Sequence, residues 1–277
     1  MSDAIFFGLF GLIVGSFLNV LILRWGERPL TGRSVCRTCG RILSWYELVP
    51  VVSWILQLGR CRGCRGWISF QYPLVEVGTG VLFALIGSSP LPFPAMVFAL
   101  PIAALLITIT VYDLQHTLIP DAWVYLLCIL ALVSMFFFSP YPILHTPYLL
   151  LAGPFVASPL FGLWFFSRGA WMGFGDVKLA LAIGWLLGGE GGLTALFLAF
   201  IIGGAFGAAL LFFSSSLWRR SSARFTPSAQ SQRAALTYTM KSEVPFGPFL
   251  VVATLIVWIS YMYGLPSGLE LLGGLPL

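Results

Sequence analysis

Two aspartates beside long apolar stretches are the residues best suited to chemistry in this sequence. Asp176 lies in WMGFGDVK, residues 171–178, between glycines and a lysine where an apolar helix is expected to begin. Asp113 ends an earlier apolar segment. A carboxylate beside hydrocarbon is rare enough to indicate function. Two such groups from different membrane helices suit peptide-bond hydrolysis, because one activates a water while the other, protonated, donates to the carbonyl.

Each aspartate also has a simpler interpretation. Taken alone, Asp113 fits the role of a carboxylate at the membrane–water interface where a span ends. Taken alone, Asp176 fits the role of a helix N-cap residue. As a pair they favour catalysis, because two carboxylates held close do not both ionise easily, and a shared proton makes one an acid and the other a base. Asp121 is a rival for the second role, although its position after Pro120 is also typical of a helix start.

Three neighbours of Asp176 are expected to support it. Gly173 and Gly175 have no side chains, so the backbone on both sides of Phe174 is open to the close approach of a substrate strand. Lys178 follows the aspartate by two residues, where it sets the charge state of the carboxylate or contacts lipid headgroups. We therefore count the two glycines and the lysine with the candidate site.

The composition places these residues in a membrane protein. The 277 residues are 58% hydrophobic and 9% charged, and a mean hydropathy of +0.94 is far too high for a soluble domain. The net charge of +5 does not indicate a nucleic-acid partner, because the fifteen Lys and Arg are confined to three stretches. Eight lie at 24–65, two at 168 and 178, and five at 219–241. Basic loops mark the cytoplasmic side of a membrane.

The apolar runs predict an all-α polytopic membrane protein with about eight transmembrane helices. Five spans are expected near residues 4–23, 72–87, 95–112, 121–138 and 148–166. A single helix over residues 177–217 would be roughly 60 Å long, about twice the hydrocarbon thickness, so two short spans broken at glycines 188–192 fit better. The last span begins near residue 244. This arrangement puts both aspartates on the cytoplasmic side and a retained, uncleaved N-terminus outside.

Four of the five cysteines form two pairs in the first basic loop, Cys36-x-x-Cys39 and Cys61-x-x-Cys64. A cytoplasmic loop is reducing, so metal ligation is favoured over disulfides. The 21 residues between the pairs are close to zinc-ribbon spacing, and four thiolates predict a closed, structural Zn²⁺ site. The fifth cysteine, Cys128, lies in a hydrophobic helix and is assigned to packing.

The chain is expected to have three parts. Residues 1–23 form the first transmembrane helix, residues 24–71 the cytoplasmic loop with the four paired cysteines, and residues 72–277 a seven-helix membrane domain that carries the aspartates. A loop of about fifty residues is too small to fold around a core of its own, so a bound metal would be needed to stabilise its fold. Gly40 and Gly63 are expected to form the tight turns at the cysteine pairs. The basic, polar residues 218–241 suggest a flexible loop with no assigned function.

Taken together, the motifs resemble those of the type IV prepilin peptidases, the leader peptidases and N-methyltransferases of bacterial inner membranes. They are GSFLNV at 15–20, the cysteine pairs with VPVVSW at 49–54 between them, YPLVE at 72–76, the segment 113–121, GFGDVKL at 173–179 and PFGPF at 245–249. Their order and spacing cover nearly the whole chain and make the resemblance specific. The chain departs from the family at Gln71, where many relatives have a basic residue, and at Arg65-Gly66, where the glycine usually follows the cysteine directly.

The resemblance implies that Asp113 and Asp176 are the catalytic aspartates of a membrane aspartic peptidase. Its substrates would be prepilins or pseudopilins, whose short basic leader lies in the cytoplasm and is cut just before a hydrophobic helix. The cysteine-containing loop would methylate the new N-terminus with S-adenosylmethionine, using its cysteines as a zinc site. Such substrates serve type IV pili, type II secretion and DNA uptake. Membrane lipid is the other expected partner, in the bacterial inner membrane.

Two other functions fit part of the pattern. The presenilin and signal-peptide-peptidase group of intramembrane proteases also carries a Tyr-Asp and a Gly-x-Gly-Asp, but its aspartates work deeper in the membrane and it lacks the cysteine loop. In a proton- or cation-coupled transporter, Asp113 and Asp176 would line an ion path. That interpretation predicts further polar residues at mid-membrane, whereas the middle of each expected span is overwhelmingly apolar.

Overall fold

Long apolar helices make up most of the structure. The computed structural model describes residues 2–26, 29–138, 146–221 and 245–265, without the side chains of residues 138, 146, 147 and 213–221. In these ranges the chain is mostly helical, and its β pairing is limited to two isolated bridges in the loop between the first two long helices. Most of the expected loop at 218–241 lies outside the described residues.

Seven long helices and two short ones follow one another along the described chain. The long ones are α1 (Ser2–Arg24), α3 (Gln71–Ser88), α4 (Phe93–His116), α5 (Asp121–Phe138), α6 (Thr146–Ser167), α7 (Phe174–Ser221) and α9 (Gly247–Met262). The short helices η1 (Trp45–Leu48) and α2 (Val52–Leu56) lie in the loop between α1 and α3, which we call the Cys loop. An apolar segment in hydrocarbon must satisfy its backbone hydrogen bonds internally, which favours helices.

Four of these helices are long and apolar enough to cross a membrane. They are α1, α4, residues 148–167 of α6 and residues 174–212 of α7, and α5 and α9 are shorter apolar helices. The helical membrane class predicted from composition therefore agrees with the structure.

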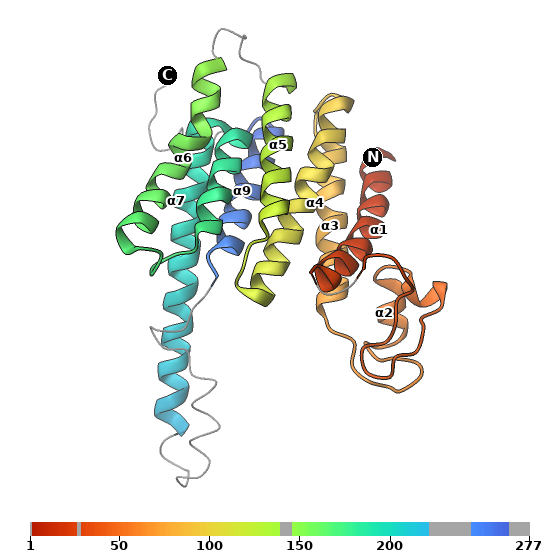
Figure 1. Cartoon of the computed structure of the whole chain (residues 1–277). Helices are drawn as coiled ribbons and strands as arrows, with labels where there is room; N and C mark the ends of the chain where they lie inside the picture. The colour runs from red at the N-terminus through yellow and green to blue at the C-terminus, as the bar shows by residue number, and fades with distance from the viewer. Residues whose placement is uncertain (1, 27–28, 139–145, 222–244, 266–277) are drawn as a thin grey trace.

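The 48-residue helix α7 consists of two helical halves, because it is broken at Gly188. Gly188 has φ 75° and ψ 179°, a non-helical conformation that glycine adopts at no steric cost. The chain folds back there. A methyl group added at Gly192 would lie 3.2 Å from Cα of Gly184, whereas eight residues of straight helix span about 12 Å. The break lies in the glycine cluster where the sequence predicted it (Figure 1).

Close packing fixes α1 against α3. A methyl group added at Gly15 of α1 would lie 2.7 Å from Cα of Glu76 in α3, an approach that only glycine permits. One turn further along α1, the side-chain amide of Asn19 donates to the carbonyl oxygens of Gly15 and Tyr72, each at 3.2 Å. Because α1 and α3 carry the two ends of the Cys loop, this contact also sets where the loop begins and ends.

Helix α4 runs one turn further than the sequence indicated, so Asp113 lies inside its last turn and not beyond its end. The helix ends at Thr117, which has a left-handed φ of 50° and whose N–H donates to the carbonyl oxygen of Asp113 at 2.8 Å. Hydropathy marks where hydrocarbon ends, whereas the backbone stays helical into the polar region. The end of the span predicted from hydropathy therefore falls one turn before the end of the helix.

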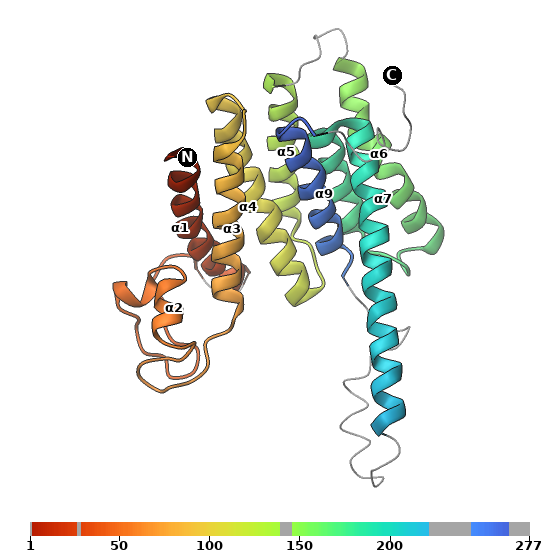
Figure 2. The ribbon, with the colours of Figure 1, turned by 180° about the vertical axis from the view of Figure 1, so that it is seen from behind.

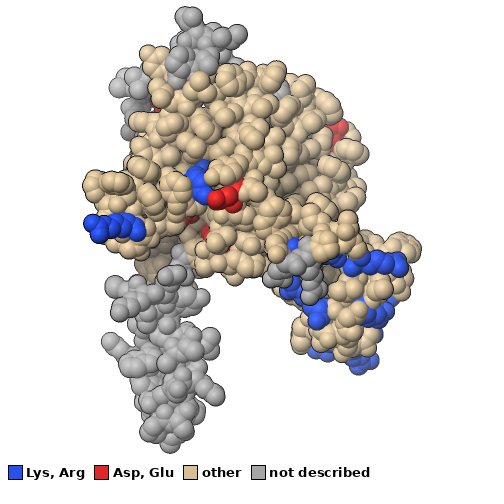
Figure 3. Space-filling model, viewed as in Figure 1, with Lys and Arg blue, Asp and Glu red and all other residues tan. Residues whose placement is uncertain are grey.

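The helices form a bundle with the candidate site and the Cys loop at one end. Helix α4 is central: it contacts α1, α3, α5 and α9, and its Leu106 and Ile109 are fully buried. Figures 1 and 2 place the α4–α5 connection, the start of α7 and the Cys loop at the lower end of the helices. In Figure 3, Lys and Arg gather on the Cys loop, while the helical surface above it carries little charge.

Candidate functional site

Helices α4 and α7 bring Asp113 and Asp176 together at the lower end of the bundle. Asp113, in the last turn of α4, is 4% exposed, and Asp176, in the first turn of α7, is 8% exposed. The two carboxylates are close enough to repel each other electrostatically. Since α7 begins at Phe174, Asp176 lies inside the helix and does not occupy the N-cap position before it. Acid–base hydrolysis needs two interacting, buried carboxylates of this kind.

Gly247, the first residue of α9, closes the site from a third side. Its backbone N–H donates to the Asp113 carboxylate, and a methyl group added there would lie 2.5 Å from Oδ2 of Asp113. The side chain of Ile119 lies between this glycine and Gly175, because methyl groups added at the two positions would come within 3.3 Å and 3.1 Å of it. A methyl group at Gly173 would be 4.0 Å from the α7 carboxylate, an ordinary contact.

Lys178 of α7 and Asp121 of α5 form an ion pair. The side chain of Asp121, at the start of α5, is 59% exposed, and that of Lys178 is 15% exposed. The Lys178 ammonium also lies 5.4 Å from the ring centroid of Phe174 and 5.7 Å from that of Tyr125. The rival carboxylate therefore pairs with the lysine that the sequence suggested for Asp176.

The four cysteines of the Cys loop converge on one point. Their sulfur atoms all lie within 4.8 Å of one another, and Sγ of Cys36 is 3.9 Å from Sγ of Cys64. Four sulfurs at about 2.3 Å from a tetrahedral Zn²⁺ would be about 3.8 Å apart, so the cluster is compatible with zinc. The backbone N–H of Cys39 lowers the pKa of the Cys36 thiol to about 6, which favours the thiolate that binds metals.

The two cysteine pairs form matching turns. The N–H of Gly40 donates to the carbonyl oxygen of Cys36 at 2.9 Å, and the N–H of Arg65 donates to that of Cys61 at 2.9 Å. The residue after each pair is left-handed, with φ 71° at Gly40 and 55° at Arg65. Gly63 lies within the second turn, as expected, and its N–H donates to Sγ of Cys61 at 3.4 Å, but the left-handed position is held by Arg65. The turn needs its left-handed residue after the second cysteine of the pair, and Gly63 precedes it.

Glu47 stabilises the Cys loop from within. It is 6% exposed, accepts a hydrogen bond from the N–H of Ser44 at 2.9 Å and forms an ion pair with Arg41. The Ser44 N–H and then the Arg41 guanidinium hold the pKa of Glu47 below its ordinary value. A buried carboxylate satisfied in this way orders the chain between the two cysteine pairs.

Glu76 of α3 ties the Cys loop to the membrane helices. It is 6% exposed and accepts hydrogen bonds from the N–H of Val51, at 2.7 Å, and from Ser16 of α1. Val51 has φ 61° and ψ −52°, and the N–H of Val52 donates to the carbonyl oxygen of Pro50 at 2.5 Å. This is the rare, strained form of the γ-turn, and it is unusual for a β-branched residue. The carboxylate stabilises the turn by accepting its N–H.

Sequence reasoning missed the roles of four residues: Gly247, Ile119, Glu76 and Glu47. Gly247 and Glu76 lie in motifs that carried the family resemblance, but nothing local assigned them a contact. Glu47 follows Ser44 by three residues, a capping-box pattern that could have been recognised. Ile119 also lies in such a motif, the segment 113–121, but its role depends on contacts between segments far apart in the chain.

Comparison with known proteins matches most of the chain to two related domains. Residues 9–89 match the Bacterial Peptidase A24 N-terminal domain, and residues 100–208 match the Type IV leader peptidase family. The first match contains the Cys loop, and the second contains both buried aspartates. The two matches therefore divide the chain between the metal-binding candidate and the carboxylate pair.

Three relatives named prepilin leader peptidase/N-methyltransferase resemble the chain, two of them over most of its length. One from Bacillus subtilis (strain 168) is 34% identical over 241 residues, which cover 79% of this chain and 87% of the relative. One from Aeromonas salmonicida (strain A449) is 28% identical over 284 residues, covering 92% and 89%. One from Myxococcus xanthus (strain DK1622) is 42% identical over 120 residues, covering 42% and 36%. No solved structure matches the chain.

Replacing Glu76 by glutamine is expected to loosen the Cys loop without unfolding the bundle. The neutral amide loses the charge-assisted hydrogen bond to Val51, a loss of about 1.5 kcal/mol, so amide exchange at residues 49–53 should become roughly tenfold faster. Hydrogen–deuterium exchange with mass spectrometry measures this, and the exchange of α4 and α5 serves as the internal control. Unchanged exchange at residues 49–53, or faster exchange throughout, would contradict the role assigned to Glu76.

Proposed function

Since the chain belongs to the Type IV leader peptidase family, we propose that it is a membrane prepilin leader peptidase and N-methyltransferase in which Asp113 and Asp176 cleave the leader. The observation that carries this proposal is the pair of buried, interacting carboxylates at the end of α4 and the start of α7. Both lie in the part of the chain that matches the leader peptidase family. An aspartic peptidase needs no other catalytic side chain.

The two carboxylates would act as acid and base. The ionised one takes a proton from the attacking water, and the protonated one donates to the carbonyl oxygen of the scissile peptide. The N–H of Gly247 holds the Asp113 carboxylate in place. Its hydrogen bond suits the ionised form, so we assign Asp113 as the base and Asp176 as the acid in the first step.

The substrate would reach the site from the cytoplasmic side of the bacterial inner membrane. We infer eight crossings, with the two halves of α7 counted separately and the N-terminus outside. The break at Gly188 and the arginine-rich Cys loop at the lower end of the helices support this topology. A prepilin leader is short and basic and precedes an apolar helix, so its scissile bond would lie at the same edge as the aspartates.

The Cys loop would be the part associated with methylation, with Cys36, Cys39, Cys61 and Cys64 as zinc ligands. A closed site of four thiolates is structural, and zinc would stabilise a segment too small to build its own core. The remaining residues, 72–277, would form the peptidase domain. Supporting roles near Asp176 fall to Gly175, which is packed against Ile119, with Gly173 and Lys178 as nearby candidates.

S-adenosylmethionine would be the methyl donor, but the arginine-lined cavity of the Cys loop does not fit it. That cavity is lined by Arg60, Arg62 and Arg65 and by no carboxylate. A sulfonium cation is disfavoured beside three guanidinium groups. The residues that line this cavity are therefore not assigned to the methyl donor.

Replacing either buried aspartate by asparagine is expected to lower cleavage of a prepilin by at least about 10³-fold, because an amide exchanges no proton with water or carbonyl. Purified protein in nanodiscs would be assayed by mass spectrometry, which also detects the gain of one methyl group when S-adenosylmethionine is added. Glu190→Gln, an exposed acid-to-amide change in α7, is the matched control. If Asp121→Asn abolished cleavage while Asp113→Asn or Asp176→Asn left it intact, the pair would be assigned wrongly.

A methyl group at residue 247 should reduce cleavage while leaving the fold intact. In Gly247→Ala the added carbon would lie 2.5 Å from Oδ2 of Asp113, so the carboxylate must move. A displacement of this size in an active site lowers the rate by up to about 100-fold. Gly162→Ala, in α6 with no atom within 4 Å, is the control and should keep the wild-type rate. Equal rates for the two variants would remove Gly247 from the site.

Zinc content should depend on the loop cysteines and not on Cys128. Wild-type protein purified under reducing conditions is expected to hold about one zinc ion per chain, and Cys64→Ser should lose it because three thiolates bind zinc far more weakly than four. Cys128→Ser, which changes the buried cysteine of α5, should keep it. Elemental analysis by mass spectrometry measures the metal. A Cys64→Ser protein with full zinc content would refute the site.

A further inference from the structure

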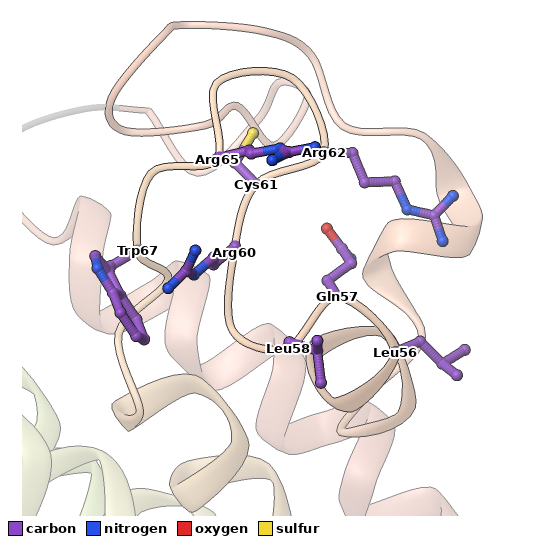
Figure 4. Close-up of a pocket in the computed structure, with 8 residues that line it drawn as sticks. All are labelled: Leu56, Gln57, Leu58, Arg60, Cys61, Arg62, Arg65 and Trp67. Atoms are coloured by element: carbon purple, nitrogen blue, oxygen red, sulfur yellow. The ribbon is translucent and has the colours of Figure 1, made fainter.

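The Cys loop contains a cavity whose lining is cationic. Its volume is about 540 Å³, and it is lined by Leu56, Gln57, Leu58, Arg60, Cys61, Arg62, Arg65 and Trp67 (Figure 4). No carboxylate contributes to the lining, and neither of the two ion pairs found among the described residues involves these arginines. Three guanidinium groups that share one cavity suit an anion.

The cavity has an apolar end and a basic end. Figure 4 shows Leu56, the last residue of α2, and Leu58 at one end, Arg62 and Arg65 at the other, and Arg60 and Trp67 along one side. The guanidinium carbon of Arg60 lies 4.6 Å from the ring centroid of Trp67. The lining thus matches an amphiphilic ligand. An anionic head group would lie beside the arginines, and a hydrocarbon chain would lie beside the leucines.

Two residues of the lining occupy left-handed positions of turns: Leu58 follows the end of α2, and Arg65 follows the second cysteine pair. Leu58 has φ 50° and Arg65 has φ 55°, left-handed values that disfavour both side chains. In the matching turn of the first cysteine pair this place is held by Gly40, which adopts it freely. Leu58 is also 80% exposed, so burial within the chain does not stabilise it. Both turns therefore keep a large side chain where glycine would be less strained, and both side chains line the cavity.

The position of α2 favours the bilayer as the surface that covers these residues. In Figures 1 and 2, α2 lies at the height of the lower turns of α1 and α3 and to the side of the bundle. Leu56 is 71% exposed and Trp67 is 76% exposed. Exposed leucine, tryptophan and arginine in one place are typical of a segment at the membrane–water interface.

We propose that this cavity binds an anionic phospholipid of the cytoplasmic leaflet, with the phosphate between Arg60 and Arg65 and the acyl chains against Leu56 and Leu58. A lipid headgroup and free phosphate would present the same phosphate group to the arginines. Only the lipid also has acyl chains that can pack against the leucine end of the cavity. Such binding would hold the Cys loop against the membrane beside the leader-peptidase site. It does not depend on which residues cleave the substrate.

Lipid binding by paired variants tests this directly. Delipidated full-length protein in detergent would be titrated with phosphatidylglycerol or with phosphatidylcholine, and bound lipid counted by native mass spectrometry. Each arginine near an anionic lipid contributes about fivefold in affinity, so Arg60→Gln/Arg65→Gln should bind phosphatidylglycerol roughly 30-fold more weakly. Arg33→Gln/Arg37→Gln removes the same charge from exposed positions of the same loop outside the cavity and should bind normally. Equal loss in both pairs would show a general charge effect and overturn the site.

The variant Arg65→Gly separates binding from folding. It removes the cation and relieves the left-handed strain, so phosphatidylglycerol affinity should fall about fivefold while zinc content and thermal stability stay at or above wild type. Inorganic phosphate and S-adenosylmethionine are tested as competitors, and neither should displace the lipid at millimolar concentration. Displacement by either one, or unchanged lipid affinity in Arg65→Gly, would overturn the proposal.

Discussion

The structure depends on holding two carboxylates close together at the edge of a low-dielectric interior. Each loses hydration there, and they repel each other, so hydrogen bonds and tight packing must offset a cost of several kcal/mol. Asp113 receives the N–H of Gly247, and Ile119 fills the space beside it. The groups come from the end of α4, the start of α7 and the start of α9, so the bundle must close correctly before the site exists.

Glycine is the means by which these apolar helices approach one another. Lipid is as apolar as leucine, so helix association in a membrane rests on close contact and not on hydrophobic burial. Gly15 brings α1 onto α3, Gly184 packs against the backbone of α6, and Gly192 lies against Val156 of α6 and Cα of Gly184 in the other half of α7. Gly247 allows the same close approach at the candidate site, where the neighbouring group is the carboxylate of Asp113. A side chain at any of these positions would collide with backbone or with a functional group.

The sequence predicted what local chemistry determines. It gave the helical membrane class, the family, the clustering of the four cysteines and the break at Gly188, because hydropathy, spacing and glycine content carry these features. It did not give the contact of Gly247 with Asp113 or that of Glu76 with Val51, since each joins segments far apart in the chain. The left-handed Arg65 after the second cysteine pair was not predicted either, because it contradicts the usual preference for glycine at such a position.

The Cys loop is a segment whose conformation is imposed from outside. Of the five described non-glycine residues with positive φ, three lie in it: Val51, Leu58 and Arg65. A loop this small has too little core to hold three strained residues by packing alone. Glu76 of α3 stabilises the first, a metal bound by the cysteines would fix the turn that contains the third, and the bilayer would cover the second. Folding of the loop is therefore coupled to the membrane domain, and an isolated loop would lack two of its three constraints.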